Sequence, residues 1–362
     1  MKITGWQVFW IVAIVEVVMA VWLRISPAIE MAKQDAWMSM LISYAIGGVI
    51  TFLVVKVSMQ HPGRSLAEFS QDLLGPWLGR LLLLPYFTAW FILSGDVLRS
   101  FADFIHLVLL DKTPVWLLMV LLIGAAVYLT GTSGITGIGR FCEIAGPVTI
   151  LTLLVSFLLN AANVKWNNLQ PLVGDAKLTE IITASLAPSS FLAESFMLLV
   201  LLSFLTSSKH VMGKSMLSVG LTGMMLFLST IMVLLVFGPT VAQELRFPYF
   251  MLVRSINILN FIQNVDILVL FIWIFGVFAK ISLYLFITSY ELGKCLRVKS
   301  WKRLMWFSAP LIFLIAMWIP NEAAIVLLQD LWEMIVIPVC AVAIPLCLLI
   351  VTSAKKKMLK AE

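Results

Sequence analysis

The sequence predicts an all-α integral membrane protein with about ten transmembrane helices. Of its 362 residues, 61% are hydrophobic and only 12% are charged, whereas soluble domains contain about 45–50% apolar and about 25% charged residues. A soluble fold cannot hide that much apolar surface, but a lipid bilayer accepts it. At roughly 20 apolar residues per span, the chain has room for about ten spans. We therefore expect one membrane domain over residues 1–362, without a separate soluble domain.

The positions of the spans follow from the apolar stretches. Tryptophans lie near many of the expected span ends, where their amphipathic rings prefer the membrane–water interface. We place the spans near residues 5–24, 37–57, 81–106, 115–132, 143–161, 181–204, 215–237, 265–290, 303–320 and 331–353.

The distribution of basic residues predicts the orientation. If the N-terminus is cytoplasmic, that side of the membrane carries 16 Lys and Arg residues and the far side carries 7. Cytoplasmic loops carry an excess of such residues, so both termini are expected inside. This orientation requires an even number of spans, and ten satisfies the requirement.

The layout of the loops indicates an inverted repeat. Two connections, 58–80 and 238–264, are long and carry helical apolar patterns of their own, and each follows the second span of a five-span half. Because five is odd, the second half (about 181–353) runs inverted relative to the first (about 5–161). Transporters with such repeats bind substrate near the membrane midplane, between broken helices in matching positions. Those helices would be spans one and six.

The two candidate broken helices differ in their sequence signals. In span six, the segment Leu186-Ala187-Pro188-Ser189-Ser190 is expected to interrupt the helix, because Pro188 removes a backbone donor. Ser189 and Ser190 are then available to the freed backbone groups or to a ligand. Span one contains neither Gly nor Pro between Trp6 and Trp22, so its sequence shows no break.

Ionisable residues inside the spans are the first functional candidates, because they are costly in a membrane. Glu16 and Glu194 lie near the middle of spans one and six, and we expect them to face a shared central cavity. Arg99 in span three and Lys280 in span eight occupy matching positions of the two halves and are expected to compensate these acids partly. Such buried groups are candidates for proton exchange.

Span three also carries Asp96 and Asp103. The spacings to Arg99 are three and four residues, so all three side chains share one helical face. They form either part of a charge-coupling site or a self-neutralised structural cluster.

Several other functions are not supported. The stretch 131–140 (GTSGITGIGR) is rich in glycine, but it follows a membrane helix and lacks the Lys-Ser/Thr ending of a phosphate-binding loop. We interpret it as a flexible cytoplasmic connection between spans four and five. The four cysteines show no metal-ligand spacing, and no catalytic triad stands out. We therefore expect neither an enzyme, nor a cofactor, nor a metal site. The net charge of +6 belongs to loops and does not indicate nucleic-acid binding.

Short motifs distributed over the chain resemble a known family, the permease-like B subunits of spore germinant receptors. The matching residues are Gln34-Asp35-Ala36-Trp37, Thr113-Pro114-Val115-Trp116, Gly139-Arg140 with Glu143, Asn168-Leu169-Gln170-Pro171, Phe247-Pro248 through Arg254, Asp266, Trp273 and Lys280, and Ile319-Pro320-Asn321-Glu322. Each motif is weak alone, but their order and spacing together are fairly specific. These proteins belong to the amino acid–polyamine–organocation superfamily, with its LeuT-like fold.

The resemblance implies a subunit of a nutrient receptor in the spore inner membrane. It would assemble with an A subunit and a lipoprotein C subunit, bind a small nutrient such as an amino acid, and trigger germination. The ligand pocket would form around Glu16 to Ala20 and Pro188 to Glu194.

Two departures from the superfamily pattern bear on this reading. Relatives usually carry glycine at the break in span one, where this chain has Val17, Val18 and Met19. Lys280 lies in span eight, which helps to build a cation site in sodium-coupled relatives, so its ammonium group could replace a cation. The alternatives are a proton-coupled amino-acid transporter acting alone and a membrane scaffold or channel with a vestigial pocket.

Overall fold

The computed structural model describes residues 1–23, 25–257 and 265–361 as a bundle of long helices. The α-helices are α1 (Gly5–Leu23), α2 (Ile25–Ala32), α3 (Ala36–Ser58), α4 (Leu66–Leu74), α5 (Pro76–Leu81), α6 (Leu84–Val108), α7 (Val115–Leu159), α8 (Leu178–Ala184), α9 (Leu186–Leu192), α10 (Leu198–Leu201), α11 (Val211–Ala242), α12 (Pro248–Arg254), α13 (Asp266–Cys295), α14 (Trp301–Trp318), α15 (Glu322–Leu331) and α16 (Ile344–Ala361). Short 3-10 segments are η1 (Lys33–Asp35), η2 (Ala161–Asn163), η3 (Trp166–Leu169), η4 (Ala193–Met197) and η5 (Leu202–Phe204), and η6 (Trp332–Ala343) is a π-helix.

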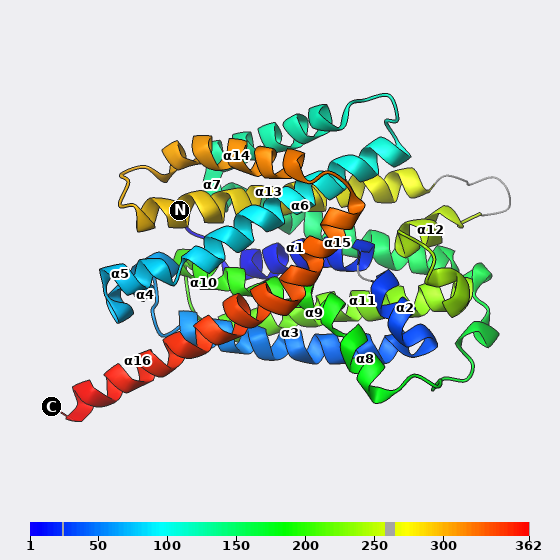
Figure 1. Ribbon diagram of the computed structural model, residues 1–362, viewed down its shortest axis with the longest axis horizontal. Helices are drawn as coiled ribbons and strands as arrows, with labels where there is room; N and C mark the ends of the chain where they lie inside the picture. The colour runs from blue at the N-terminus through cyan, green and yellow to red at the C-terminus, as the bar shows by residue number, and fades with distance from the viewer. Residues whose placement is uncertain (24, 258–264, 362) are drawn as a thin grey trace.

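The described helices account for ten membrane crossings. Eight helical segments among the described residues are long and apolar enough to span a membrane. One of them, α7, has 45 residues, or about 68 Å at 1.5 Å per residue, which is more than twice the roughly 30 Å hydrocarbon core. It turns back at Gly134, whose φ of 57° and ψ of −150° are non-helical, and so crosses twice. The 18-residue helix α14 is not one of these eight segments, but it packs along α6 and α13 (Figure 1), and we count it as the tenth crossing.

The connection between spans four and five differs from the sequence expectation. Residues 131–140 are helical on both sides of Gly134 instead of forming a flexible loop. A single residue suffices to reverse the chain because glycine adopts positive φ at little cost. A side chain would also meet the N-terminal residue here, since a Cβ on Gly134 would lie 2.6 Å from the sulfur of Met1.

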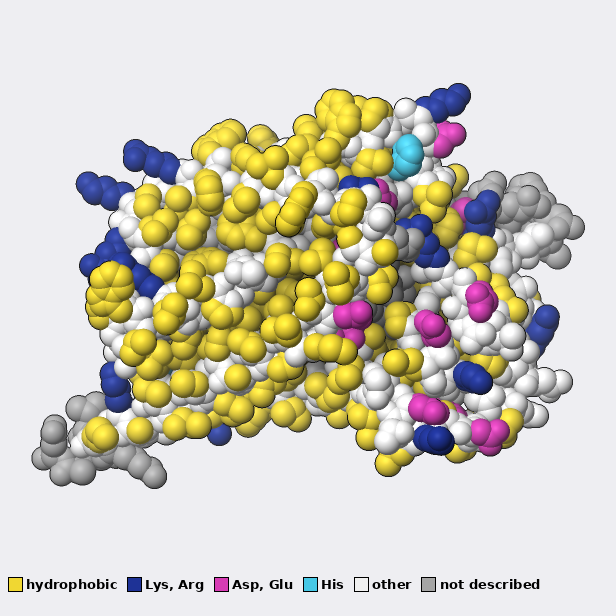
Figure 2. All heavy atoms as spheres, in the orientation of Figure 1, with side chains coloured by type: hydrophobic (Ala, Val, Ile, Leu, Met, Phe, Trp, Pro, Cys, Tyr) yellow, Lys and Arg dark blue, Asp and Glu magenta, His cyan; other side chains and the backbone are white. Residues whose placement is uncertain are grey.

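The two ends of the bundle are distinct. The N-terminus and the end of α16 lie at the same end, beside α4 and α5, whereas α2, α8 and α12 lie at the opposite end (Figure 1). This agrees with an even number of spans. On the face seen in Figure 2, hydrophobic side chains cover the middle of the molecule, and most charged side chains lie toward its two ends. The two long connections contain helices, as predicted: α4 and α5 in one, α12 in the other.

Spans one and six form the centre of the bundle. The membrane-spanning window of span six is 94% buried and that of span one is 83% buried, compared with 33% for α7 and 28% for the last span. Helix α13 is also largely enclosed, at 78%. Glu16, Glu194 and Lys280, which these three segments carry, are 0% exposed and are therefore held away from lipid and water.

A motif after span one fixes the outer loops. Asp35 accepts hydrogen bonds from the backbone N–H groups of Gly174 and Ala176, at 2.7 and 3.2 Å. The side chains of Gln34 and Trp37 donate to backbone carbonyls of residues 171 and 172, at 3.0 and 3.2 Å. Two of the sequence motifs, 34–37 and 168–171, thus lie against each other at the end of the bundle opposite the chain termini.

Candidate functional site

Span six, which carries Glu194, is assembled from short helical pieces. Pro188 lies in the first turn of α9, after a turn at Ser185. The first N–H groups of a helix have no intrahelical partner, so proline is tolerated there. The helix is therefore interrupted at Ser185, one residue before the expected segment 186–190, and that segment itself is helical. A second irregularity lies further on, where Glu194 sits in the 3-10 segment η4.

Serines satisfy the backbone around this region. The hydroxyl groups of Ser189 and Ser190 donate to backbone carbonyls three residues earlier, at 2.8 and 2.6 Å. Two serines that sequence reasoning missed, Ser39 and Ser43 of α3, donate to two backbone carbonyls of span six at 2.9 and 2.8 Å. In this conformation all four hydroxyls are occupied by protein, and Ser189 and Ser190 remain predicted ligand contacts.

A charged cluster lies at the centre of the bundle. Lys280 of α13 donates to Glu194, with 2.8 Å between Nζ and Oε1, and both side chains are 0% exposed. Tyr284, one helical turn further along α13, donates to the other carboxylate oxygen of Glu194 at 2.7 Å. The Lys280 ammonium also lies 3.5 Å from the carbonyl oxygen of Val15 and 4.8 Å from the ring centroid of Phe191. Spans one, six and eight therefore meet at one ammonium group.

Glu16 adds a second acid to this cluster. It is 0% exposed and close enough to Glu194 and Lys280 for their charges to interact. Neither of its carboxyl oxygens has a hydrogen-bond partner among the residues that the structure describes. An isolated buried carboxylate is strongly disfavoured. The cluster of two acids and one base is therefore balanced only when Glu16 binds a proton or another cationic group.

Span one passes this cluster as an uninterrupted helix. α1 continues through Glu16 and Ala20 to Leu23, and Ala20 is fully buried. A close approach of α1 to α13 replaces the expected cavity: a Cβ on Gly276 would lie 2.0 Å from Cγ2 of Val18. The glycine that permits close packing is thus on span eight, opposite a valine of span one. A remaining space of about 20 Å³ beside Val18 and Trp273 is nearly filled.

Span three divides its charges between two places. Arg99 donates to Asp103 at 2.7 Å and to the carbonyl oxygen of Ile319 at 2.5 Å. The sequence had suggested that Arg99 compensates the acids of the cluster. This expectation is wrong, because Arg99 pairs within its own helix. Asp96, by contrast, is 7% exposed and near enough to Lys280 for their charges to interact.

An open cavity lies on the side of the bundle opposite the chain ends. This vestibule has a volume of about 430 Å³ and is lined by Ser26, Pro27, Glu30, Ser100, Gln243, Glu244, Leu245, Arg246, Phe247, Ile325, Val326 and Gln329. Gln329 also lines a small inner space of about 10 Å³ that reaches Asp96, Phe191 and Trp332. Phe191 contacts this space and the Lys280 ammonium. Phe191 and Asp96 thus lie between the inner space and the charged cluster.

The other end of the bundle is closed. The backbone of Ile3 pairs with residues 204–206 at the end of span six, with N–H to oxygen distances of 2.9 Å. Gln7 of α1 donates to Glu143 of α7 at 3.0 Å. These contacts fix the start of span one to spans five and six, so the central cluster is approached from the vestibule end.

The sequence comparisons identify a family that spans most of the chain. The family model described as "Spore germination protein" matches residues 2–325. The chain is 24% identical to spore germination protein YndE of Bacillus subtilis, over 89% of this chain and 88% of that protein. It is 23% identical to spore germination protein KB of the same organism, over 74% and 72% of the two chains.

Solved structures show the same fold. The transporter MhsT, in complex with L-phenylalanine, aligns with a TM-score of 0.60 at 12% identity and covers 97% of this chain and 99% of its own. Mhp1, a nucleobase-cation-symport-1 family transporter with bromovinylhydantoin bound, aligns with a TM-score of 0.58 at 16% identity, over 90% and 74% of the chains. The fold is thus the LeuT-like arrangement of inverted five-helix halves. With the family match over residues 2–325, this multi-pass membrane protein belongs to the spore germination permease family.

Proposed function

We propose that this protein is the nutrient-sensing, permease-like subunit of a spore germinant receptor. The observation that carries the proposal is the Glu16–Glu194–Lys280 cluster, which is buried in a transporter fold beside a small inner space that shares Gln329 with an open vestibule. Intramembrane ionisable residues are expensive and are retained mainly for function. In this view the protein lies in the spore inner membrane with both termini on the core side, beside an A subunit and a lipoprotein C subunit.

The vestibule favours a zwitterionic ligand. Its lining carries two exposed acids, Glu30 and Glu244, and one exposed base, Arg246. An amino acid presents an ammonium group to the acids and a carboxylate to the guanidinium group, which favours planar carboxylates. Its ammonium group would also supply the positive charge that the inner cluster lacks beside Glu16. An amino acid therefore suits both the entrance and the cluster.

Sensing would occur by a shift between a closed and an open state of the cluster. A ligand biases two states only through its different affinity for them. In the closed state Lys280 donates a hydrogen bond to Glu194, and the ring of Phe191 packs against the ammonium group. A ligand ammonium near Glu16 and Glu194 would compete with Lys280 and move α13 relative to α1. That displacement would be transmitted to the partner subunits.

A proton-coupled transporter acting alone is the second candidate. It is favoured by the paired acid and base inside the membrane, an arrangement suited to proton relay. The two functions differ in net flux: a transporter moves the nutrient across the bilayer, whereas a sensor only binds it.

A substitution in the cluster tests the sensing role. Spores carrying Glu194→Gln should need a higher nutrient concentration to germinate, because the amide cannot hold the ligand ammonium as a carboxylate does. The protein should still insert, since Lys280 retains Glu16 as an acidic neighbour. Asp111→Asn, on an exposed loop, is the control and should respond like wild type. A normal response of Glu194→Gln at every nutrient concentration, with normal abundance, would exclude Glu194 from the site.

A further inference from the structure

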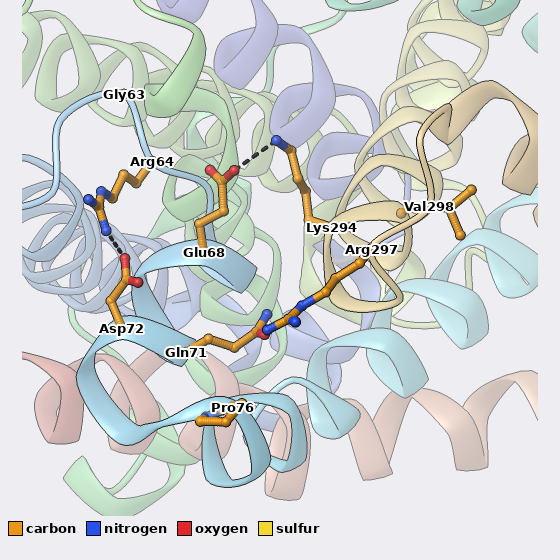
Figure 3. A pocket seen from close by; sticks show the side chains of 10 residues that line it. Gly63, Arg64, Glu68, Gln71, Asp72, Pro76, Lys294, Arg297 and Val298 are labelled. Atoms are coloured by element: carbon orange, nitrogen blue, oxygen red, sulfur yellow. Dashed lines mark hydrogen bonds and ion pairs between the residues drawn. The ribbon is translucent and has the colours of Figure 1, made fainter.

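A second cavity lies at the end of the bundle that carries both chain termini. It has a volume of about 790 Å³ and opens between the connection 63–76 and the end of α13 at residues 293–298 (Figure 3). We call this cavity the α4–α13 cleft. Its walls come from segments that are more than 200 residues apart in the sequence. Nothing in the proposed nutrient site uses it.

The charges of the cleft are paired with one exception. Lys294 donates to Glu68 at 2.7 Å, and Arg64 pairs with Asp72. Burial opposes ionisation of Glu68, but its hydrogen bonds to Lys294 and to the backbone of Ser65 hold its pKa below the usual value. Both acids are therefore neutralised by bases of the cleft, and the lining keeps an excess of one positive charge.

Arg297 supplies this excess charge. Its side chain reaches across the cleft toward Gln71 (Figure 3). Within the described residues the guanidinium group has no ion-pair partner. Its backbone is in the left-handed region, with φ of 56°, at the position after a helix where glycine is usual. A side chain there costs on the order of 1 kcal/mol. An arginine is thus held in strained backbone with its charge directed into an open cavity.

The walls of the cleft are joined firmly. Glu291 of α13 is 0% exposed and accepts a hydrogen bond from the N–H group of Ala67 in the first turn of α4, at 2.7 Å. Together with the Glu68–Lys294 pair, this bond joins α4 to α13. The cleft is therefore a preformed site.

We propose that the α4–α13 cleft docks a short acidic segment of a partner protein, with a carboxylate of that segment bound by Arg297 and Gln71. The guanidinium fork binds carboxylates through two parallel hydrogen bonds. A volume of about 790 Å³ accommodates several residues in place of a single headgroup. The carboxylate oxygens of Glu68 and Asp72 in the lining favour a peptide, whose backbone N–H groups can donate to them, over a phosphodiester group, which has no donor.

The docked segment would lie close to the sensing helix. Lys280 and Lys294 are on the same helix, 14 residues apart, or about 21 Å along its axis. A displacement of α13 in the cluster would therefore alter the cleft. The coupling of the cleft to nutrient sensing rests on the proposed function, but the binding of an acidic segment does not.

Binding of a fluorescent hexaglutamate peptide to the full-length protein in phosphatidylcholine nanodiscs tests the proposal. Arg297→Gly should weaken binding at least about tenfold, as expected for loss of a charged hydrogen-bonded pair. It should keep or raise the melting temperature, because glycine adopts positive φ without strain. Lys302→Gln removes the same charge from an exposed residue outside the cleft and should change neither quantity.

Three results would overturn the proposal: no hexaglutamate binding to wild type, equal weakening by both variants, or displacement of the peptide by phosphatidylglycerol in the nanodisc, which would assign the cleft to lipid. Nutrient binding by the Arg297→Gly protein, measured in parallel, should equal that of wild type. The two binding measurements therefore distinguish an incorrect proposal for the nutrient site from an incorrect proposal for the cleft.

Discussion

Replacing Lys280 by methionine removes the only base from the central cluster that the structure describes. Lys280 and Glu194 are both 0% exposed, and their charged atoms are 2.8 Å apart. Breaking a buried pair by deleting one partner costs about 3–5 kcal/mol, because a charge remains buried without compensation. The loss in free energy of unfolding for Lys280→Met should lie in this range, since Glu16 and Glu194 would both lose the cation beside them. Glu194→Gln should cost less, because Glu16 still faces Lys280.

The double variant Lys280→Met/Glu194→Gln distinguishes the energetic effect of the ion pair from the effect of changed side-chain packing. It removes both charges with little change of volume, so its free energy of unfolding should return to within about 1 kcal/mol of wild type. Unfolding by sodium dodecyl sulfate in mixed micelles, followed by circular dichroism, gives these values. Lys302→Met, at an exposed position, is the control and should stay within about 0.5 kcal/mol. A stable Lys280→Met protein, or a double variant as unstable as the single one, would refute the reasoning.

Two further predictions concern the packing of α1 and the contacts of the chain end. Gly276→Ala should destabilise the protein by about 1–3 kcal/mol, because the methyl group meets Val18 at 2.0 Å, and Val18→Ala should restore most of the loss in the same assay. His61 Nε2 lies 3.0 Å from the hydroxyl oxygen of Thr352 on α16. Burial, Lys356 and Arg64 lower the pKa of His61 from 6.5, so neutral His61 supports this contact above about pH 6.5. That contact should weaken as the pH falls through the lowered pKa. Hydrogen exchange of residues 59–65, corrected for intrinsic pH dependence, should show this loosening in wild type and lose it in His61→Gln; equal protection at pH 5 and 7.5 would contradict it.

Much of the fold was predictable because the bilayer restricts the choices. The apolar runs fixed the number of crossings, and the excess of basic residues on one side agreed with termini at one end of the bundle (Figure 1). The local structure of span six was not predictable in the same way. Pro188 signals a break in isolation, but its effect depends on where the helix begins, and the turn at Ser185 places it in a first turn.

The sequence predicted the members of the charged cluster better than its geometry. Glu16, Glu194 and Lys280 stood out as intramembrane charges, and the structure brings them together. Tyr284 could have been found, because it lies one helical turn after Lys280. Phe191 lies within the expected pocket segment 188–194, but its contact with Lys280 could not be predicted, since an aromatic residue in an apolar span carries no signal until its neighbours are known. The close packing at Gly276 likewise depends on which helix faces it.

The central claim is that this chain binds a nutrient in a transporter fold without moving it across the membrane. Equilibrium binding of a labelled amino-acid panel to the purified protein in liposomes, with uptake measured with and without a proton gradient, tests it most directly. We expect saturable binding of at least one amino acid that is weakened by Glu194→Gln, and no accumulation under either condition. Concentrative uptake driven by the gradient would contradict it and establish the chain as a transporter.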